Sequence, residues 1–440
     1  MSKIEQKLVI PPKPKSRRRR SAVKIVLLLS LIEIGVMVFL FQTIPPVNAP
    51  ASLKPVQSVP KAGDVIAKDA SITFAPAEAT ALIAHNYPSG VPGAPVGIKK
   101  FTFHYRSALP DGKLITVYAR AYLPDDNRMK LPVFAFAPGT TGIGDQCAPS
   151  LEKPGVANWG NYDSHMSAYA SQGFAAVTTD YEGMRDPSRL HHYMIGELEG
   201  RALLDAVRAL RQLPATSSRL GGDVFLGGYS QGGHAAFWAD KIAEQYAPDV
   251  KPVGVVGFGP VMSVKETLTD ITHAANINWF GPNVLVSYQD YYQQVYPGVL
   301  LPNREVDLAA NVIAHCIDTD LPYWGHTPVG LYTPEFIQAA LNGTVESSYP
   351  QFSQNLHANA VGAVPTSSAK RINQGALDNV VLPSQQTAAL PELCASSKGA
   401  VQLMLYQKTT HYDAMLHSFG DTLTWMRALS AREPVASTCL

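Results

Sequence analysis

The amino-acid sequence predicts an α/β protein with a mostly parallel, mixed β-sheet that is covered by helices on both faces. Two stretches that alternate with period two, residues 100–106 and 115–121, come first and indicate antiparallel strands. Helical periodicity lies further along, for example at residues 197–213. Short continuous apolar runs are typical of strands buried on both faces, and they occur at residues 132–137, 174–178, 224–226, 253–258 and 401–406. Strands that alternate with helices favour a mainly parallel sheet.

The composition is that of a globular protein. Of 440 residues, 46% are hydrophobic and 16% are charged, so the chain has ample apolar material for a core. The net charge of +1 conceals an asymmetry. Residues 1–24 hold nine Lys and Arg against one Glu, a net of +8, and the remaining residues therefore carry −7. A mildly acidic body with a basic tail is unlike a nucleic-acid-binding protein, whose basic residues gather on a folded face.

The basic tail precedes a segment that is predicted to cross a membrane. Residues 25–41 are apolar and contain one ionisable group, Glu33. With its flanks the segment covers residues 22–44 and reaches the roughly 20 residues that a bilayer span needs. By the positive-inside rule, the basic block Arg17–Arg20 keeps the N-terminal side of this segment in the cytoplasm. The sequence therefore predicts a cytoplasmic tail at residues 1–21, a transmembrane signal anchor, and a body on the extracytoplasmic side, periplasmic or extracellular.

A cleaved signal peptide is the alternative interpretation of the same segment. Val47-Asn48-Ala49 resembles a cleavage site, and a cut near residue 49 would release a secreted protein. In both interpretations residues 45–70 form a Pro-rich linker that prolines keep stiff and extended. These prolines are Pro45, Pro46, Pro50, Pro55 and Pro60.

Beyond the linker, one α/β domain is expected to be interrupted by an insertion. Residues 71–261 and 366–440 show the alternation of strands and helices. Residues 262–365 break this rhythm, because they are rich in Trp and Tyr, carry scattered prolines and show no clear strand alternation. We interpret this segment as a mainly helical cap.

The most specific motif is centred on Ser230. The sequence Gly228-Tyr229-Ser230-Gln231-Gly232 fits G-x-S-x-G, and it stands between an apolar run and a helical stretch at residues 235–246. In the α/β-hydrolase fold this pattern places a nucleophilic serine on a tight, strained strand-to-helix turn, where only glycine fits two residues to either side. The alternative is a glycine-rich turn that merely lets the helix pack closely. The position between strand and helix favours Ser230 as the nucleophile.

A serine nucleophile needs a general base and an acid, which follow it in this fold in the order Asp, His. Asp378 lies in a loop after a possible strand, and His411 lies in the loop beyond the last predicted strand. We predict that they complete a Ser-His-Asp triad. His417 is the alternative base, and Asp413 and Asp421 are alternative acids, but all three fall in predicted helices.

The oxyanion of an acyl transfer needs backbone N–H donors. The N–H of Gln231 opens the helix after the nucleophile and is the first expected donor. The glycine-rich loop at residues 138–142 follows the apolar run 132–137 and is expected to supply the second, from Thr141 or, as a close alternative, Thr140. A plain turn stabilised by hydroxyl groups is the other interpretation.

No cofactor or metal is expected. His191-His192 has no third ligand at a useful spacing, and the pair is expected on a surface loop.

Four cysteines follow the apolar N-terminal segment: Cys147, Cys316, Cys394 and Cys439. An even number in an exported chain favours two disulfides, and four cysteines allow three pairings. We expect Cys147–Cys316, which would tie the cap to the oxyanion loop, and Cys394–Cys439, which would secure the C-terminal tail. Four buried free thiols are the alternative.

Over roughly residues 75–430 the sequence resembles the secretory lipase family. Four stretches carry the resemblance, and they are Gly139-Thr140-Thr141-Gly142 with Cys147-Ala148-Pro149-Ser150, Thr179–Gly183, Gly196–Leu213 and Gly228–His234. The resemblance implies hydrolysis of carboxylic esters, a helical cap, and Ser230, Asp378 and His411 at the triad positions. Two places differ from the family. Pro138 stands where the oxyanion loop often has histidine, and residues 369–374 are polar where the family has an apolar strand.

These observations together predict a lipase or esterase that acts through an acyl-enzyme on a small-molecule or lipid ester. A serine peptidase or amidase with the same triad is one alternative. A catalytically inactive, membrane-tethered binding protein is another, although an intact Ser–Asp–His order argues against it.

Overall fold

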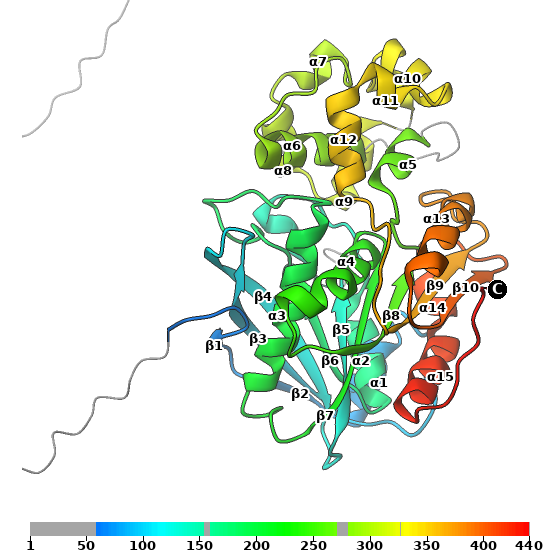
Figure 1. Ribbon diagram of the computed structural model, residues 1–440. Coiled ribbons are helices and arrows are strands. Elements are labelled where there is room, and N and C mark those ends of the chain that lie inside the picture. The colour runs from blue at the N-terminus through cyan, green and yellow to red at the C-terminus, as the bar shows by residue number, and fades with distance from the viewer. Residues whose placement is uncertain (1–58, 154–158, 271–279, 326, 440) are drawn as a thin grey trace, which may run out of the picture. The chain divides into compact units, whose positions relative to one another are not determined.

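The computed structural model describes residues 59–153, 159–270, 280–325 and 327–439 (Figure 1). Within these ranges no helix is both long and apolar enough to cross a bilayer. The predicted anchor at residues 22–44 and the possible cleavage site near residue 49 lie outside the described residues.

The core of the described unit is one mixed sheet with strand order β1-β3-β4-β6-β5-β7-β8-β9-β10, and β2 also pairs with β3. The strands are β1 (Val65–Lys68), β2 (Ile72–Phe74), β3 (Ile98–Ala108), β4 (Leu114–Pro124), β5 (Leu131–Ala137), β6 (Ala175–Thr179), β7 (Leu220–Tyr229), β8 (Pro252–Phe258), β9 (Ala369–Gly375) and β10 (Val401–Tyr406). Strands β5 to β10 are mutually parallel, and β1 to β4 pair antiparallel. The predicted mixed sheet is therefore confirmed.

Two expectations about this sheet are wrong. Strand β1 pairs with β3 and lies inside residues 45–70, which the prolines had suggested to be linker throughout. The apolar run at residues 401–406 forms an edge strand instead of one buried on both faces, because β10 has a partner only in β9. Leu405 accordingly leaves half of its side chain exposed. Apolar content alone does not distinguish an edge strand from a central one.

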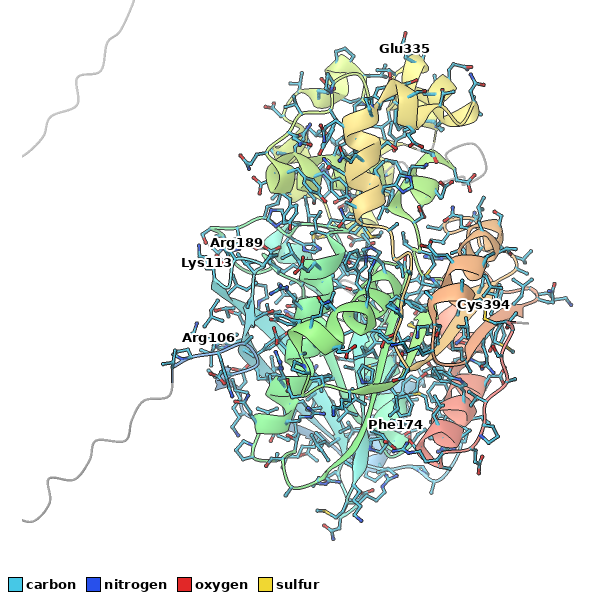
Figure 2. The ribbon with its side chains drawn as sticks, in the orientation of Figure 1. Arg106, Lys113, Phe174, Arg189, Glu335 and Cys394 are labelled. Atoms are coloured by element: carbon cyan, nitrogen blue, oxygen red, sulfur yellow. A yellow bond between two sulfur atoms is a disulfide. The ribbon has the colours of Figure 1, made fainter. Side chains whose placement is uncertain are left out.

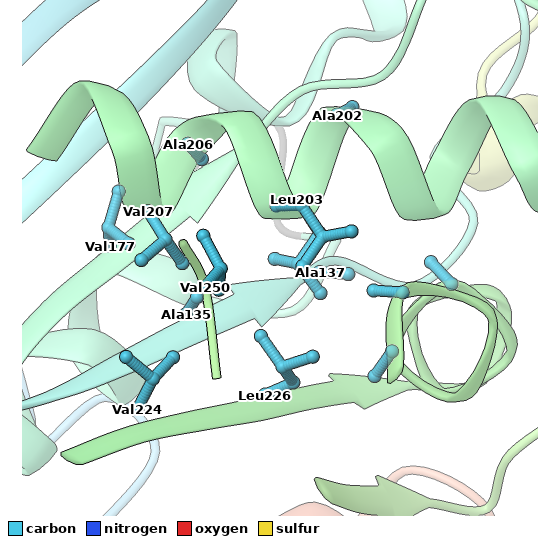
Figure 3. Close-up of a cluster of buried hydrophobic side chains, with 14 of the residues drawn as sticks. Ala135, Ala137, Val177, Ala202, Leu203, Ala206, Val207, Val224, Leu226 and Val250 are labelled. Carbon is cyan, nitrogen blue, oxygen red and sulfur yellow. The ribbon is translucent and has the colours of Figure 1, made fainter. Parts of the chain in front are cut away.

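Helices cover both faces of the sheet, and alternate residues of each strand serve one face or the other. The helices of this layer are α1 (Pro76–Ile83), α2 (Tyr162–Ser171), α3 (Gly196–Gln212), α4 (Gln231–Tyr246), α13 (Pro383–Ser396), α14 (Asp413–His417) and α15 (Phe419–Ser430). On β5, Ala135 and Ala137 face α3 and α4 (Figure 3), whereas Phe134 and Phe136 belong to the cluster packed against α2 and α15 on the other face. On α3, Leu203 and similar buried side chains each stabilise the fold by about 1.5–3 kcal/mol.

A second group of helices lies beside the sheet, between β8 and β9 in the chain. They are α5 (Val264–Thr269), α6 (Phe280–Tyr292), α7 (Pro302–Glu305), α8 (Leu308–Ala314), α9 (Ile317–Trp324), α10 (Pro334–Leu341), α11 (Val345–Ser348) and α12 (Pro350–Ala358). Helix α10 begins where the Thr333 hydroxyl accepts a hydrogen bond from the Phe336 N–H and Pro334 fixes the first turn. The group has a core of its own, centred on buried aromatic side chains such as Tyr288, Trp324 and Tyr332.

The parallel strands point their carboxyl ends toward this helical layer. Phe174 directly precedes β6 and lies at the end of the unit remote from the layer, while Glu335 on α10 marks the outer side of the layer (Figure 2). The loops that follow β5, β7, β9 and β10 therefore gather beneath α5–α12 (Figure 1). In open α/β sheets this edge is where ligands bind.

Candidate active site

Ser230 occupies a strained turn between β7 and α4. Its φ of 55° and ψ of −115° lie outside the regions that L-residues favour. A Cβ on Gly228 would lie 1.9 Å from the Gly232 carbonyl oxygen, and a Cβ on Gly232 would lie 1.8 Å from that of Ala137. The Ser230 N–H donates to the Phe258 carbonyl at 3.0 Å, which fixes the turn against β8. Glycine is therefore required on either side of the serine.

Asp378 and His411 are joined by a hydrogen bond. His411 lies beyond β10, and its Nδ1 is 2.7 Å from Asp378 Oδ2. The other carboxylate oxygen accepts from the N–H groups of Val380 and Val381, each at 2.9 Å, and Gln374 Nε2 donates to Oδ2 at 2.9 Å. Because four donors surround the carboxylate, its direction and that of the imidazole are both fixed.

The same geometry brings His411 next to the serine turn. The rings of Tyr229 and His411 lie 4.9 Å apart between centroids. Gly259 follows Phe258, whose carbonyl accepts the hydrogen bond from the Ser230 N–H. A Cβ on Gly259 would lie 2.9 Å from His411 Nδ1 and 3.1 Å from Asp378 Oδ2. Ser230 is 6% exposed and His411 is 8% exposed. These two described residues share no hydrogen bond, and catalytic contacts of this kind often tighten only with substrate.

The alternative bases and acids have other partners. His417 Nδ1 lies 2.9 Å from the Thr409 hydroxyl, Asp413 accepts from the Thr410 hydroxyl at 2.7 Å, and Asp421 accepts from the Tyr406 hydroxyl at 3.0 Å. None of these contacts includes His411, Asp378 or Ser230, so the geometry favours His411 and Asp378.

The loop expected to supply an oxyanion donor is firmly held. The Gly139 N–H donates to the Tyr162 hydroxyl at 2.8 Å, and the hydroxyls of Thr140 and Tyr193 lie 2.6 Å apart. The Thr141 carbonyl accepts from the Ile317 N–H at 2.9 Å, whereas its own buried hydroxyl has no partner. Gln231 is the first residue of α4, and first-turn N–H groups have no acceptor within their own helix. Both expected donor segments thus lie beside Ser230.

The polar sequence at residues 369–374 forms β9, and all of its side chains are buried. Lys370 Nζ lies 3.6 Å from an oxygen of the buried Asp240, and Arg371 donates to Gln402 at 2.7 Å. Asn373 donates to the Thr422 hydroxyl at 2.8 Å, and Gln374 donates to the Asp378 carboxylate at 2.9 Å. Each of these four side chains therefore has a polar partner within the fold, although the buried Gln374 Oε1 itself has none. The contact between Gln374 and Asp378 was not predicted from the sequence. The position of Gln374, four residues before Asp378, is the signal that could have indicated it.

His191 and His192 do not lie on a surface loop, and that expectation is wrong. Both side chains are buried. Burial lowers the pKa of His191, whose Nδ1 lies 3.0 Å from the Glu182 carbonyl oxygen. Burial also disfavours the charged form of His192, but hydrogen bonds with Glu182 and Asp290 outweigh it and raise the pKa of His192 overall. Partners distant in the sequence, which a local pattern does not reveal, make burial of this pair possible.

The cysteines are paired as predicted, Cys147 with Cys316 and Cys394 with Cys439. The first disulfide joins the segment after the oxyanion loop to the start of α9. A Cβ on Gly142, whose φ is 119°, would lie 2.8 Å from Cys147 Sγ, so the loop packs directly on this disulfide.

Comparison with known proteins agrees with this geometry. A family model described as secretory lipase matches residues 161–437, which is more than half of the chain. The chain belongs to the secretory lipase family. Among relatives of known sequence, lipase A of Moesziomyces aphidis is 28% identical over 188 residues, 38% of this chain and 37% of that protein. Lipase 1 of Candida albicans is 22% identical over 318 residues, 67% of this chain and 64% of that protein.

Neither match spans two thirds of the length of these two lipases. Among solved structures, the rice cell wall degrading esterase LipA from Xanthomonas oryzae superposes with a TM-score of 0.69 at 18% identity, covering 85% of this chain and all of that one. At that identity the likeness establishes the fold, a mixed sheet with helices of the α/β-hydrolase type.

Proposed function

We propose that this secretory lipase family member hydrolyses carboxylic esters through Ser230, His411 and Asp378. The observation that carries the proposal is the Asp378–His411 hydrogen bond of 2.7 Å beside the strained Ser230 turn. His411 Nε2 takes the proton of Ser230 as the hydroxyl attacks the ester carbonyl, and Asp378 orients the imidazole and stabilises its charged form. An acyl-enzyme forms as the alcohol leaves, and water then hydrolyses it.

The N–H groups of Gln231 and Thr141 would stabilise the oxyanion of each tetrahedral intermediate. The strained turn supports this role for Gln231, because it directs the first N–H groups of α4 toward the nucleophile. Hydrogen bonds to Tyr162, Tyr193 and Ile317 support the role of the Thr141 loop, because they hold it rigid. No cofactor takes part in this scheme.

The helices α5–α12 are proposed to act as a cap over the triad. They lie at the carboxyl edge of the sheet, and the Cys147–Cys316 disulfide ties them to the oxyanion loop. A cap of this kind would line the acyl-binding site. The lipase relatives suggest that the substrate is a lipid ester, and the cleavage of amides or peptides is the alternative.

A panel of p-nitrophenyl esters of increasing acyl length tests the proposed activity. We expect wild-type protein to hydrolyse at least part of the panel and to leave matched p-nitroanilides nearly untouched. The acyl length with the highest kcat/KM would define the acyl preference. Faster cleavage of the anilides would support a peptidase or amidase, and failure on both panels would support a binding protein.

The protein is proposed to act outside the cytoplasm, held by the anchor at residues 22–44. Membership in a secretory family supports export, while the apolar segment and its basic flank support the anchor. We expect full-length protein to sediment with membranes and to resist an alkaline carbonate wash. A C-terminal alkaline phosphatase fusion in a bacterial host should be active. Soluble protein whose N-terminus starts near Pro50 would instead indicate a cleaved signal peptide.

A further inference from the structure

A cluster of buried polar side chains lies directly behind the serine turn, and the mechanism above uses none of these side chains. It consists of Glu199 on α3, Gln231 and His234 on the first turn of α4, and His191 from the loop before α3. Each of these side chains is at most 1% exposed. We call this group the Glu199 cluster.

Glu199 is the acceptor at the centre of the cluster. Its Oε1 accepts from Gln231 Nε2 at 2.8 Å and from the Met194 N–H at 3.0 Å. Its Oε2 lies 2.8 Å from His234 Nδ1. Leaving a buried carboxylate without these partners would be costly, so the contacts are mutually dependent.

The side chain of Gln231 is fixed by a second contact. Burial lowers the pKa of His191 and keeps it neutral. Its Nδ1–H donates to the Glu182 carbonyl at 3.0 Å, so its Nε2 is free to accept from Gln231 Nε2 at 3.1 Å. Both amide hydrogens of Gln231 are thus used, one on Glu199 and one on His191.

His234 extends the support along the same face of α4. Its Nε2 lies 2.7 Å from the carbonyl oxygen of Asn359, just beyond α12, and must carry a proton because a carbonyl only accepts. The backbone N–H of His234 donates to the Ser230 carbonyl at 3.2 Å. Close packing makes these contacts possible, since a Cβ on Gly200 of α3 would lie 2.8 Å from the Ala239 nitrogen of α4.

We infer that Glu199 is a positioning residue for transition-state stabilisation: through Gln231 and His234 it holds the first turn of α4, and with it the N–H of Gln231 that would face the oxyanion. The inference rests on the proposed function, because it concerns the oxyanion donor of that reaction. A donor acts only if it is aimed at the developing oxyanion. A small displacement of the donor therefore lowers kcat more than it weakens substrate binding.

The test compares Glu199→Ala with Glu199→Gln on a short p-nitrophenyl ester. For Glu199→Ala we expect kcat to fall by about 10-fold to 100-fold while KM changes by less than about 3-fold. For Glu199→Gln we expect kcat near that of wild type. The amide oxygen can accept from Gln231 and Met194, and the amide nitrogen can donate to His234 Nδ1 in the tautomer that carries its proton on Nε2.

Asp205→Ala is the matched control on the same helix. Asp205 is also buried, but it accepts from the Ser107 and Tyr246 hydroxyls at 2.7 and 2.6 Å and does not contact α4's first turn. This variant should lower the melting temperature and leave kcat within about 2-fold, because only a positioning role links a buried carboxylate to the rate.

Gln231→Ala provides a second route if Glu199→Ala does not fold. It keeps the backbone N–H and removes the side-chain link, so its kcat should fall by about 10-fold, and in the double variant the two losses should not add. Two results would overturn this inference but not the proposed function. One is a folded Glu199→Ala variant with wild-type kcat, and the other is a loss of kcat in Asp205→Ala as large as that in Glu199→Ala. A wild-type protein inactive on every ester would overturn the proposed function together with it.

Discussion

Replacing His411 with alanine is expected to lower kcat for ester hydrolysis by about 10³-fold or more, as loss of a triad member usually does. His411 is the proposed base, its Nδ1 is hydrogen-bonded to Asp378, and its ring packs against that of Tyr229, the neighbour of Ser230. Without the imidazole, no side chain at this position accepts the serine proton. Steady-state kinetics on the best p-nitrophenyl ester, with circular dichroism to verify folding, would measure the loss.

His417→Ala is the matched control for that variant. His417 lies on α14, six residues further along the chain, and its Nδ1 contacts the Thr409 hydroxyl. We expect its activity to stay within a few-fold of wild type. The reverse pattern, an inactive His417→Ala and an active His411→Ala, would transfer the role of base to His417.

Asp378→Asn is expected to lower kcat by a similar factor, about 10³-fold or more, through the tautomer of His411. The carboxylate has donors at both oxygens, two N–H groups at Oδ1 and the side chains of Gln374 and His411 at Oδ2. If the new amide keeps its oxygen toward Val380 and Val381, its NH₂ faces His411 Nδ1 and donates to it. The proton of the imidazole then sits on Nε2, which can no longer accept from Ser230.

Asp413→Asn serves as the control for the acid, because Asp413 contacts the Thr410 hydroxyl and not His411. Its kcat should match that of wild type within about 2-fold. A pH–rate profile would add a second readout, since a wrong tautomer changes how kcat depends on pH, whereas a mere loss of stability leaves the shape of the profile intact. Full activity of Asp378→Asn would show that another group orients His411.

Local patterns predicted the parts of this site that depend on neighbours in the sequence. Gly228 and Gly232 flank Ser230 because the backbone of one turn leaves no room for a side chain, and the order of Asp378 and His411 follows from the order of the strands. The antiparallel pair β3 and β4 was also evident, because residues on one face of a half-exposed strand alternate.

Features that depend on partners distant in the sequence could not be predicted from local patterns. The sequence of β9 looked unsuited to a buried strand. In the structure, however, Lys370 forms an ion pair with Asp240, and Arg371 donates a hydrogen bond to Gln402. His191 and His192 looked like surface residues, although both are buried and contact the buried Glu182, and the exposed Asp290 contacts His192. In each case a buried polar group is stable only because the fold supplies its partner, which no local spacing encodes.

Labelling with a fluorophosphonate probe tests the central claim most directly, because the probe reacts with an activated serine whatever the natural ester is. Attack by the Ser230 oxygen on phosphorus forms an O–P bond and releases fluoride. We predict that wild-type protein gains one probe, that peptide mapping locates it on Ser230, and that Ser230→Ala gains none. Equal labelling of Ser230→Ala, or no labelling of folded wild type, would contradict the assignment of Ser230 as the nucleophile.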